Sequence, residues 1–135
     1  MTTTQKNQCK TYFRIVGNFD PDAVCDRLGL TPDRVRRVCD PLPNNRIADS
    51  AFCNFGTVEE YDVYTDRQME KTIAPLQGKE EILNAIRQEY DVEFFIVAVA
   101  KITADESTPT LAPSLTVMDF CHAVRAQIDV DLYVI

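Results

Sequence analysis

The segment that most constrains the fold is residues 92–102, VEFFIVAVAKI, the most hydrophobic part of the chain. Alternation along an extended chain places Phe94 and Ile96 on one face, and Phe95 and Val97 on the other. Both faces are therefore apolar. A strand of this kind is typical of the middle of a sheet that is covered on both sides. We expect residues 92–102 to form a central strand with the other elements arranged around it.

Alternation also predicts a strand at each end of the chain. Residues 9–17 place Phe13 and Ile15 on one face, and Tyr12 and Arg14 on the other. The last strand, residues 128–134 (IDVDLYV), divides in the same way. Its apolar half is Ile128, Val130, Leu132 and Val134, and its polar half is Asp129, Asp131 and Tyr133. We expect the apolar half to pack against the core.

Capping residues and helical spacing predict the helices. Asp20-Pro21 starts a short helix that ends at Gly29. Residues 65–68 and 116–119 resemble capping boxes, and a further helical piece spans about 79–89. Buried helical stripes are predicted at Met69, Ile73 and Leu76, at Ile82, Leu83, Ile86 and Tyr90, and at Val117, Phe120, Cys121 and Val124.

Two more strands are predicted at 33–39 and 51–57, separated by a proline-containing loop at 40–50. Whether the second of them continues through residues 58–64 stays open. The element order is then β-α-β-β-α-β followed by α-β. This order predicts an α+β fold: a ferredoxin-like sandwich with an appended helix and strand, and helices on one face of a mainly antiparallel sheet. The chain has 135 residues, which suits a single domain at 9–135 after a disordered tail at 1–8.

The net charge of −7 argues against general binding to nucleic acid or to anionic lipid, because both need a basic face. Arg34, Arg36 and Arg37, with Arg27 nearby, are a local exception. They could bind one phosphate or an acidic partner, or they could be the charges that protect an edge strand from aggregation. No apolar run is long enough to span a membrane, and the N-terminus has no hydrophobic signal region. We expect a cytoplasmic protein.

Five cysteines, an odd number, occur without a Cys-x-x-Cys pair, which favours reduced thiols over disulfides or a zinc site. The only histidine, His122, follows Cys121. Neighbouring helical positions diverge by about 100°, so these two side chains do not face each other as a nucleophile and its base. Glycine-rich phosphate loops and hydrolase motifs do not occur. We expect no catalytic residue, no metal and no cofactor.

The best candidate site combines Tyr12 and Arg14 with the polar half of the last strand: Asp129, Asp131 and Tyr133. If the first and last strands belong to one sheet, these side chains share a face. An arginine among carboxylates could hold a ligand or a partner, or it could be a structural ion pair. Two carboxylates on one strand make a poor metal site by themselves.

Residues 12–17 (YFRIVG), 19–22 (FDPD) and 28–32 (LGLTP), together with the closing IDVDLYV, resemble the DUF4279 family, a bacterial domain of unknown function. The resemblance spans roughly residues 10–135. Family members often have a tryptophan and a Gly-Asp pair after the Thr-Pro segment. This chain has no tryptophan, and Cys39-Asp40 stands at the Gly-Asp position. The resemblance implies a bacterial cytosolic protein and supplies no catalytic residue.

Two functions follow from these observations. The first is a non-enzymatic protein-interaction module, a homodimer in which a second subunit covers the apolar face of the central strand. Its acidity would suit neutralisation of a basic partner such as a toxin. The alternative is a small-ligand-binding protein or minor enzyme that uses the polar sheet face, with Arg14, Asp129, Asp131 and Tyr133 as its residues.

Overall fold

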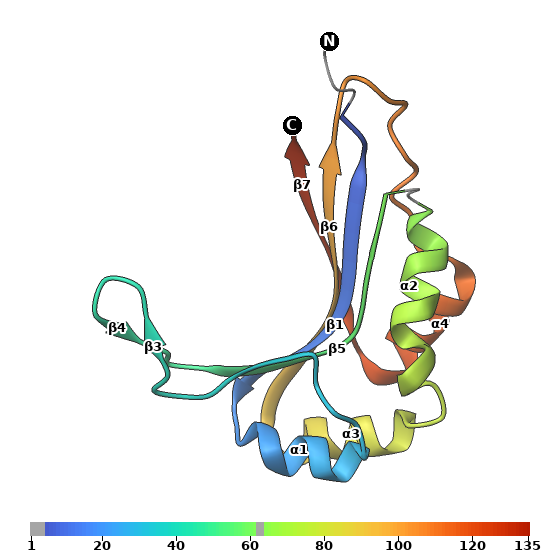
Figure 1. Cartoon of the computed structure of the whole chain (residues 1–135). Helices are drawn as coiled ribbons and strands as arrows, with labels where there is room; N and C mark the ends of the chain where they lie inside the picture. The colour runs from blue at the N-terminus through green and yellow to red at the C-terminus, as the bar shows by residue number, and fades with distance from the viewer. Residues whose placement is uncertain (1–4, 62–63) are drawn as a thin grey trace.

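The computed structural model describes residues 5–61 and 64–135. These residues form an α+β fold in which helices cover one face of a mixed, mainly antiparallel sheet (Figure 1). The strands are β1 (Gln8–Asn18), β2 (Arg34–Arg36), β3 (Pro41–Leu42), β4 (Arg46–Ile47), β5 (Ala51–Glu60), β6 (Asp91–Ile102) and β7 (Gln127–Val134). The helices are α1 (Pro21–Leu28), α2 (Thr65–Ile73), the 3-10 turn η1 (Ala74–Leu76), α3 (Glu80–Glu89) and α4 (Leu115–Val124).

The main sheet has five strands in the order β2-β5-β1-β6-β7. Antiparallel pairs join β2 to β5, β5 to β1 and β1 to β6, and one parallel pair joins β6 to β7. The parallel pair needs a crossover, which α4 provides, because two parallel strands cannot be linked by a tight turn. The first and last strands of the chain are therefore in one sheet, separated only by β6.

The sheet is strongly curved, and the helices lie on its convex side (Figure 1). One cause is a bulge in β5, where the pairing with β1 shifts between Thr11 and Phe13. Gly56 takes a φ of 64° at this bulge, and an added Cβ would lie 2.1 Å from the Thr72 carbonyl oxygen. A bulge of this kind bends a strand and increases its twist. We call the concave, helix-free side of the sheet the open face.

The strand β6 was predicted to be covered on both sides, with a second subunit over one of them, and within this chain the helices lie on one side (Figure 1). Helices cover only the side of Phe94 and Ile96, which are 1% and 0% exposed. On the open face Val97 is nevertheless only 6% exposed, and Phe95 and Val99 are half-buried. Because the open face is concave, side chains of neighbouring strands shield this apolar row without a further layer of structure.

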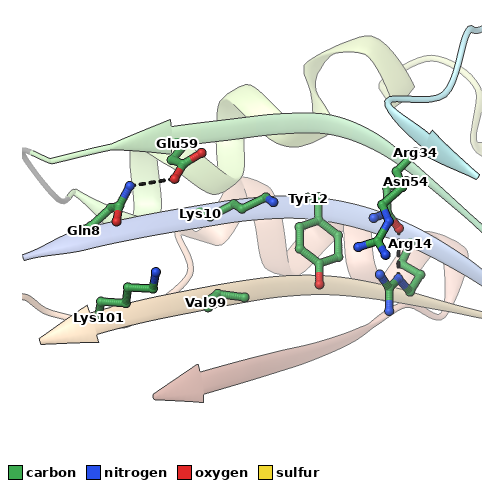
Figure 2. Close-up of a pocket in the computed structure, with 9 residues that line it drawn as sticks. All are labelled: Gln8, Lys10, Tyr12, Arg14, Arg34, Asn54, Glu59, Val99 and Lys101. Atoms are coloured by element: carbon green, nitrogen blue, oxygen red, sulfur yellow. Dashed lines mark hydrogen bonds between the residues drawn. The ribbon is translucent and has the colours of Figure 1, made fainter. Parts of the chain in front are cut away.

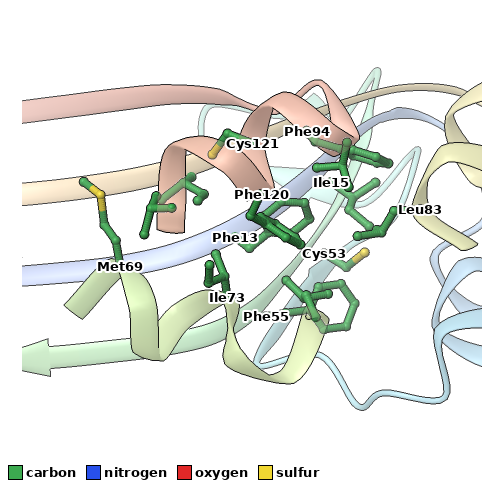
Figure 3. Packing of buried hydrophobic residues seen from close by; sticks show 14 of the residues in the cluster. Phe13, Ile15, Cys53, Phe55, Met69, Ile73, Leu83, Phe94, Phe120 and Cys121 are labelled. Atoms are coloured by element: carbon green, nitrogen blue, oxygen red, sulfur yellow. The ribbon is translucent and has the colours of Figure 1, made fainter. Parts of the chain in front are cut away.

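The core lies between the sheet and the helices and is built around Phe13 (Figure 3). The ring centroid of Phe13 is 5.6 Å from that of Phe94 and 6.0 Å from that of Phe120. The stripe predicted on α4 is buried throughout, as are Met69, Ile73 and Leu76. Helical spacing in the sequence therefore identified these core-facing positions correctly.

The predicted helix starts are confirmed at one site and wrong at two. Asp20 caps α1 by accepting a hydrogen bond of 3.0 Å from a backbone N–H of its first turn. Thr65 is already inside α2, and Tyr64 before it makes no side-chain cap bond. The N-cap of α4 is Ser114, two residues before Thr116, and its hydroxyl accepts from the backbone N–H three positions on at 3.3 Å. Serine and threonine are both favoured N-cap residues, and the sequence offers one of each within three positions, so the capping-box pattern selected the wrong one.

Residues 40–50 were predicted to be a loop, but they contain the two-stranded ribbon formed by β3 and β4. Asn44 and Asn45 turn the chain with φ values of 64° and 60°. Asparagine tolerates this left-handed conformation better than most residues, which explains why a ribbon forms in a segment rich in turn residues. The adjoining strand β5 extends to Glu60, beyond the predicted end at Thr57, and residues 62–63 lie outside the described residues.

The apolar half of the last strand was predicted to pack against the core, and this is wrong for most of it. Ile128 packs against the core, but Val130, Leu132 and Val134 are 39%, 57% and 81% exposed. The reason is that β7 is an edge strand, whereas α2 packs over β5, β1 and β6. Alternation separated the two faces of β7 correctly but did not show that both faces are exposed.

The start of the chain is tied to the loop that follows β6. Of the predicted tail, residues 1–4 lie outside the described residues, while Asn7 is only 5% exposed. The Asn7 side chain accepts a hydrogen bond from the Thr103 backbone N–H at 2.8 Å and donates one to the Ser107 carbonyl at 2.8 Å. This contact holds the beginning of β1 against the end of β6.

Candidate functional site

The five predicted site residues all lie on the open face, in two groups. Tyr12 and Arg14 are on β1, and the Arg14 guanidinium carbon is 5.1 Å from the Tyr12 ring centroid. The three β7 residues, Asp129, Asp131 and Tyr133, are exposed and lie on the far side of β6. In the sheet register Tyr12 is beside Val97, and Val97 is beside Asp129. A complete strand therefore separates the two groups.

A cleft of about 260 Å³ opens around the first group (Figure 2). It lies over β1 and its neighbours β5 and β6, with β2 at one end, and does not include β7. Its lining residues are Gln8, Lys10, Tyr12, Arg14, Arg34, Asn54, Glu59, Val99 and Lys101. Strand alternation explains the first four, because every second residue of β1 points to the open face.

Three arginines gather around a single aromatic ring at one end of this cleft. The guanidinium carbons of Arg14, Arg34 and Arg36 lie 4.0, 5.3 and 5.0 Å from the Phe52 ring centroid. The pairing of β2 with β5 and of β5 with β1 brings them together, since Arg34 and Arg14 both pair with Asn54. Cation–π attraction to the ring offsets part of their mutual repulsion.

Hydrogen bonds to neighbouring residues hold two of these arginines. The Arg14 Nε donates to the Asn54 Oδ1 at 2.9 Å, which leaves its two terminal nitrogens for other acceptors. Arg36 donates to the Ser50 carbonyl at 3.2 Å and to the Ser50 hydroxyl at 2.7 Å. The hydrogen bond to Asn54 thus fixes the orientation of the Arg14 guanidinium, and a group that is already oriented loses less entropy when it binds another molecule.

The cleft is basic although the chain is acidic. Four of its lining residues are cationic and only Glu59 is anionic, and Glu59 accepts a hydrogen bond from the Gln8 side chain at 2.6 Å. Within residues 5–61 and 64–135 the ion pairs are Arg27–Glu89, Arg37–Asp22 and Lys71–Glu60. None of these pairs includes a residue of the cleft. Within the described residues, the four cations of the cleft therefore have no carboxylate partner, although they lie close together.

The surroundings of Arg14 disfavour its positive charge. Burial lowers the pKa of Arg14 below its ordinary value, and the neighbouring charges of Arg34 and Arg36 lower it further, while Tyr12 acts in the opposite direction. An arginine nevertheless stays protonated in proteins. The charge is therefore retained under repulsion, and a bound anion would relieve that repulsion.

Sequence reasoning found part of this cleft and missed the rest. Of the arginine cluster that it singled out, Arg34 and Arg36 reach the site, whereas Arg37 pairs with Asp22 and Arg27 with Glu89. Lys10 and Lys101 were missed. The available signal was alternation, because Lys10 has the same parity as Tyr12 and Arg14, and Lys101 the same parity as Val97 and Val99.

The second group of predicted residues offers a different surface. Asp129 and Asp131 are exposed on the edge strand, and Tyr133 is 51% exposed. Within the part of the chain that the structure describes, no three His, Cys, Asp or Glu side chains gather closely enough to hold a metal ion.

The cysteines lie apart from the cleft, and all five thiols are free. Burial raises the pKa of Cys9 and of Cys121 to about 11, so both are protonated thiols at neutral pH. Burial also raises the pKa of Cys53. His122, next to Cys121, is exposed, as expected for a helix position that diverges from the buried stripe.

The sequence of the chain places it in a known protein family. The sequence model of DUF4279, a domain of unknown function, matches residues 7–135. The chain belongs to the DUF4279 family. The matched residues include every strand of the main sheet and therefore the whole cleft. No curated protein and no solved structure matches this DUF4279 chain. Among its described helices, none has the length and apolar character needed to cross a membrane.

Proposed function

We propose that this DUF4279 protein binds a small anionic ligand in the cleft of the open face. The observation that carries the proposal is a group of cations that form no ion pair with any described residue: Arg14 and Arg34 at the Phe52 end, and Lys10 and Lys101 at the other. Gathering like charges costs free energy unless a counter-charge is bound, so an anion is the natural complement of this surface.

The shape of the cleft indicates the kind of anion. A volume of about 260 Å³ is slightly below the usual range for small-molecule sites, which favours a compact ligand. A phosphate or carboxylate group would take bidentate hydrogen bonds from the free nitrogens of Arg14. Tyr12 and Val99 offer an apolar wall for the remainder of the ligand.

Inorganic phosphate is the simplest probe. Thermal unfolding in phosphate and in chloride at equal ionic strength should show stabilisation by phosphate, because a ligand that binds only the folded state raises its stability. At one hundred times the dissociation constant this amounts to about 2.7 kcal/mol. Arg14→Gln and Lys101→Gln should each reduce the difference between the two salts.

The matched control is Arg37→Gln, which removes an exposed arginine paired with Asp22 outside the cleft. It changes the net charge by the same amount and should leave the phosphate effect intact. Equal phosphate stabilisation in the wild type, Arg14→Gln and Arg37→Gln would refute the proposal, as would the lack of any effect of phosphate, sulfate and succinate on the wild type.

The second candidate is a non-enzymatic protein-interaction module, with a homodimer or a basic partner such as a toxin as its occupant. The observation that favours it is the exposure of β7, with Leu132 and Val134 on one side and Asp129 and Asp131 on the other. The apolar open face is a weaker reason for a second subunit, because Val97 is already shielded within one chain. A purified protein that stays monomeric and does not bind basic polypeptides would contradict this candidate.

We also infer that the first four strands of the main sheet form a ferredoxin-like sandwich to which α4 and β7 are appended. The strand order β2-β5-β1-β6 and the alternating directions of these strands support this inference. In that interpretation α4 and β7 are the elements that distinguish this chain from the basic sandwich. An experimental structure would test it through the handedness of the connections that contain α1 and α3.

A further inference from the structure

The two edge strands of the main sheet have the same pattern with opposite charge. The edge strand β2 reads Arg34-Val-Arg36, and the other edge, β7, contains Asp129-Val-Asp131. In both strands the charged side chains point to the open face and the valine points to the helical side, as their register with β5 and β6 shows. The sheet therefore ends in a basic edge on one side and an acidic edge on the other.

The strand directions make these two edges compatible with each other. Following the pairs from β2 through β5, β1 and β6 to β7 shows that β2 and β7 run in opposite directions. If a second copy continued the sheet beyond β7, its β2 would pair antiparallel with β7. The open faces of the two copies would then lie on the same side.

The edge of β7 has the features of a surface that another strand covers. An edge strand presents unpaired backbone N–H and C=O groups, and soluble proteins usually protect such edges. Here Leu132 and Val134 add exposed apolar area. Asp129 and Asp131 take part in none of the ion pairs of the described residues. Pairing of β7 with β7 of another copy is disfavoured, because it would place aspartates directly opposite one another.

We propose that DUF4279 chains of this kind associate head to tail, with β7 of one copy adding to β2 of the next. Centring the pair on Val130 and Val35 places Asp131 opposite Arg34 and Asp129 opposite Arg36. Opposite charges facing each other across strands stabilise the pair and fix its register. The proposal rests on the second candidate function above and names its partner, a second copy.

The contact is heterologous, because different surfaces of the two copies meet. Such contacts produce closed rings or open filaments instead of two-fold dimers. Strand β2 has three residues, so the contact is short and the association is expected to be weak and dependent on concentration. It also brings each copy's basic cleft next to the acidic edge of its neighbour, since Arg34 belongs to both surfaces.

Light scattering coupled to size-exclusion chromatography over a range of concentrations tests the proposal. The wild type should form particles of at least twice the chain mass of 15.3 kDa. Asp129→Arg/Asp131→Arg should weaken association at least about a hundredfold, because like charges then face each other. Arg34→Asp/Arg36→Asp should do the same from the other edge. An equimolar mixture of the two variants should associate again, because each edge regains a complementary partner.

The control is Asp66→Arg/Glu70→Arg on the exposed face of α2, which makes the same change in net charge away from both edges. It should associate like the wild type. A wild type that stays monomeric, or an Asp129→Arg/Asp131→Arg variant that associates normally, would overturn the proposal. If Arg34→Asp/Arg36→Asp does not fold, the β7 variant still decides the question.

The same variant separates this inference from ligand binding. Asp129 and Asp131 lie outside the cleft, so Asp129→Arg/Asp131→Arg should keep its stabilisation by phosphate while losing association. If the wild type associates but is not stabilised by phosphate, only the anion proposal is overturned. Association that depends on β7 but not on β2 would indicate a different partner surface and would overturn head-to-tail pairing.

Discussion

Replacing Cys39 with glycine should stabilise the protein. Cys39 has a φ of 72°, in the left-handed region, and its side chain is exposed. Its backbone N–H donates to the Ala48 carbonyl at 2.7 Å, a bond that glycine would keep. The substitution thus removes the strained Cβ and almost nothing else.

The size of the effect follows from two opposing contributions. A non-glycine residue in the left-handed region costs about 1–2 kcal/mol. Glycine lowers the free energy of unfolding by about 0.5–1 kcal/mol, because its backbone loses more entropy on folding than that of other residues. The net gain is about 0.5–1 kcal/mol. With about 2.1 cal/mol/K of unfolding entropy per residue over 135 residues, this corresponds to a rise in Tm of about 2–4 °C.

Calorimetry and urea unfolding, with a reducing agent present, would measure this effect. Cys39→Ala is the matched control, since it removes the thiol but keeps a Cβ, and its stability should stay close to that of the wild type. Gly29→Ala is the reverse experiment: Gly29 has a φ of 66° with no atom near an added Cβ, so the same strain should now appear as a loss. If Cys39→Gly were no more stable than Cys39→Ala, the reasoning from backbone strain would be refuted.

Three further predictions concern the bulge, the buried thiols and the edge strand. Gly56→Ala should lower the free energy of unfolding in urea by more than about 2 kcal/mol, because the alanine Cβ would lie 2.1 Å from the Thr72 carbonyl oxygen of α2. An unchanged urea midpoint would contradict the bulge geometry. Stability should fall between pH 9 and 11, because the pKa values of Cys9 and Cys121 are raised from 9.0 to about 11 in the fold, so the unfolded chain ionises first. Cys9→Ala should make that decline shallower, by up to about 1.4 kcal/mol per pH unit, and an identical decline would refute the assignment. Val134→Ala should change the free energy of unfolding by less than about 0.5 kcal/mol, because Val134 is exposed, whereas Ile96→Ala should lower it by about 2–5 kcal/mol, because Ile96 is buried. Equal losses would show that Val134 is in the core.

The parts of the fold that sequence predicted well are those governed by local periodicity. The stripe of α4, the alternation of β1 and the cap at Asp20 each depend on residues a few positions apart, and each was identified correctly. The same reasoning placed Tyr12 and Arg14 on the sheet face that bears the cleft. The spacing of side chains on one element depends on backbone geometry alone, which the sequence pattern reveals.

The parts that sequence missed depend on which elements become neighbours. Arg34 reaches Phe52 only because β2 pairs with β5. Lys101 belongs to the cleft only because β6 lies beside β1. The exposure of Val134 follows from the position of β7 at the edge of the sheet, not from its own pattern.

The sequence by itself determined the α+β class, the family, the core faces of the helices and the open-face side of β1. The tertiary structure alone decided that the cleft is basic, because its cations come from strands far apart in the chain. It also decided that Asp129 and Asp131 lie outside that cleft, one strand beyond it. The physical reason is that hydrogen-bonded strand pairing, and not sequence distance, sets which charges meet in a sheet.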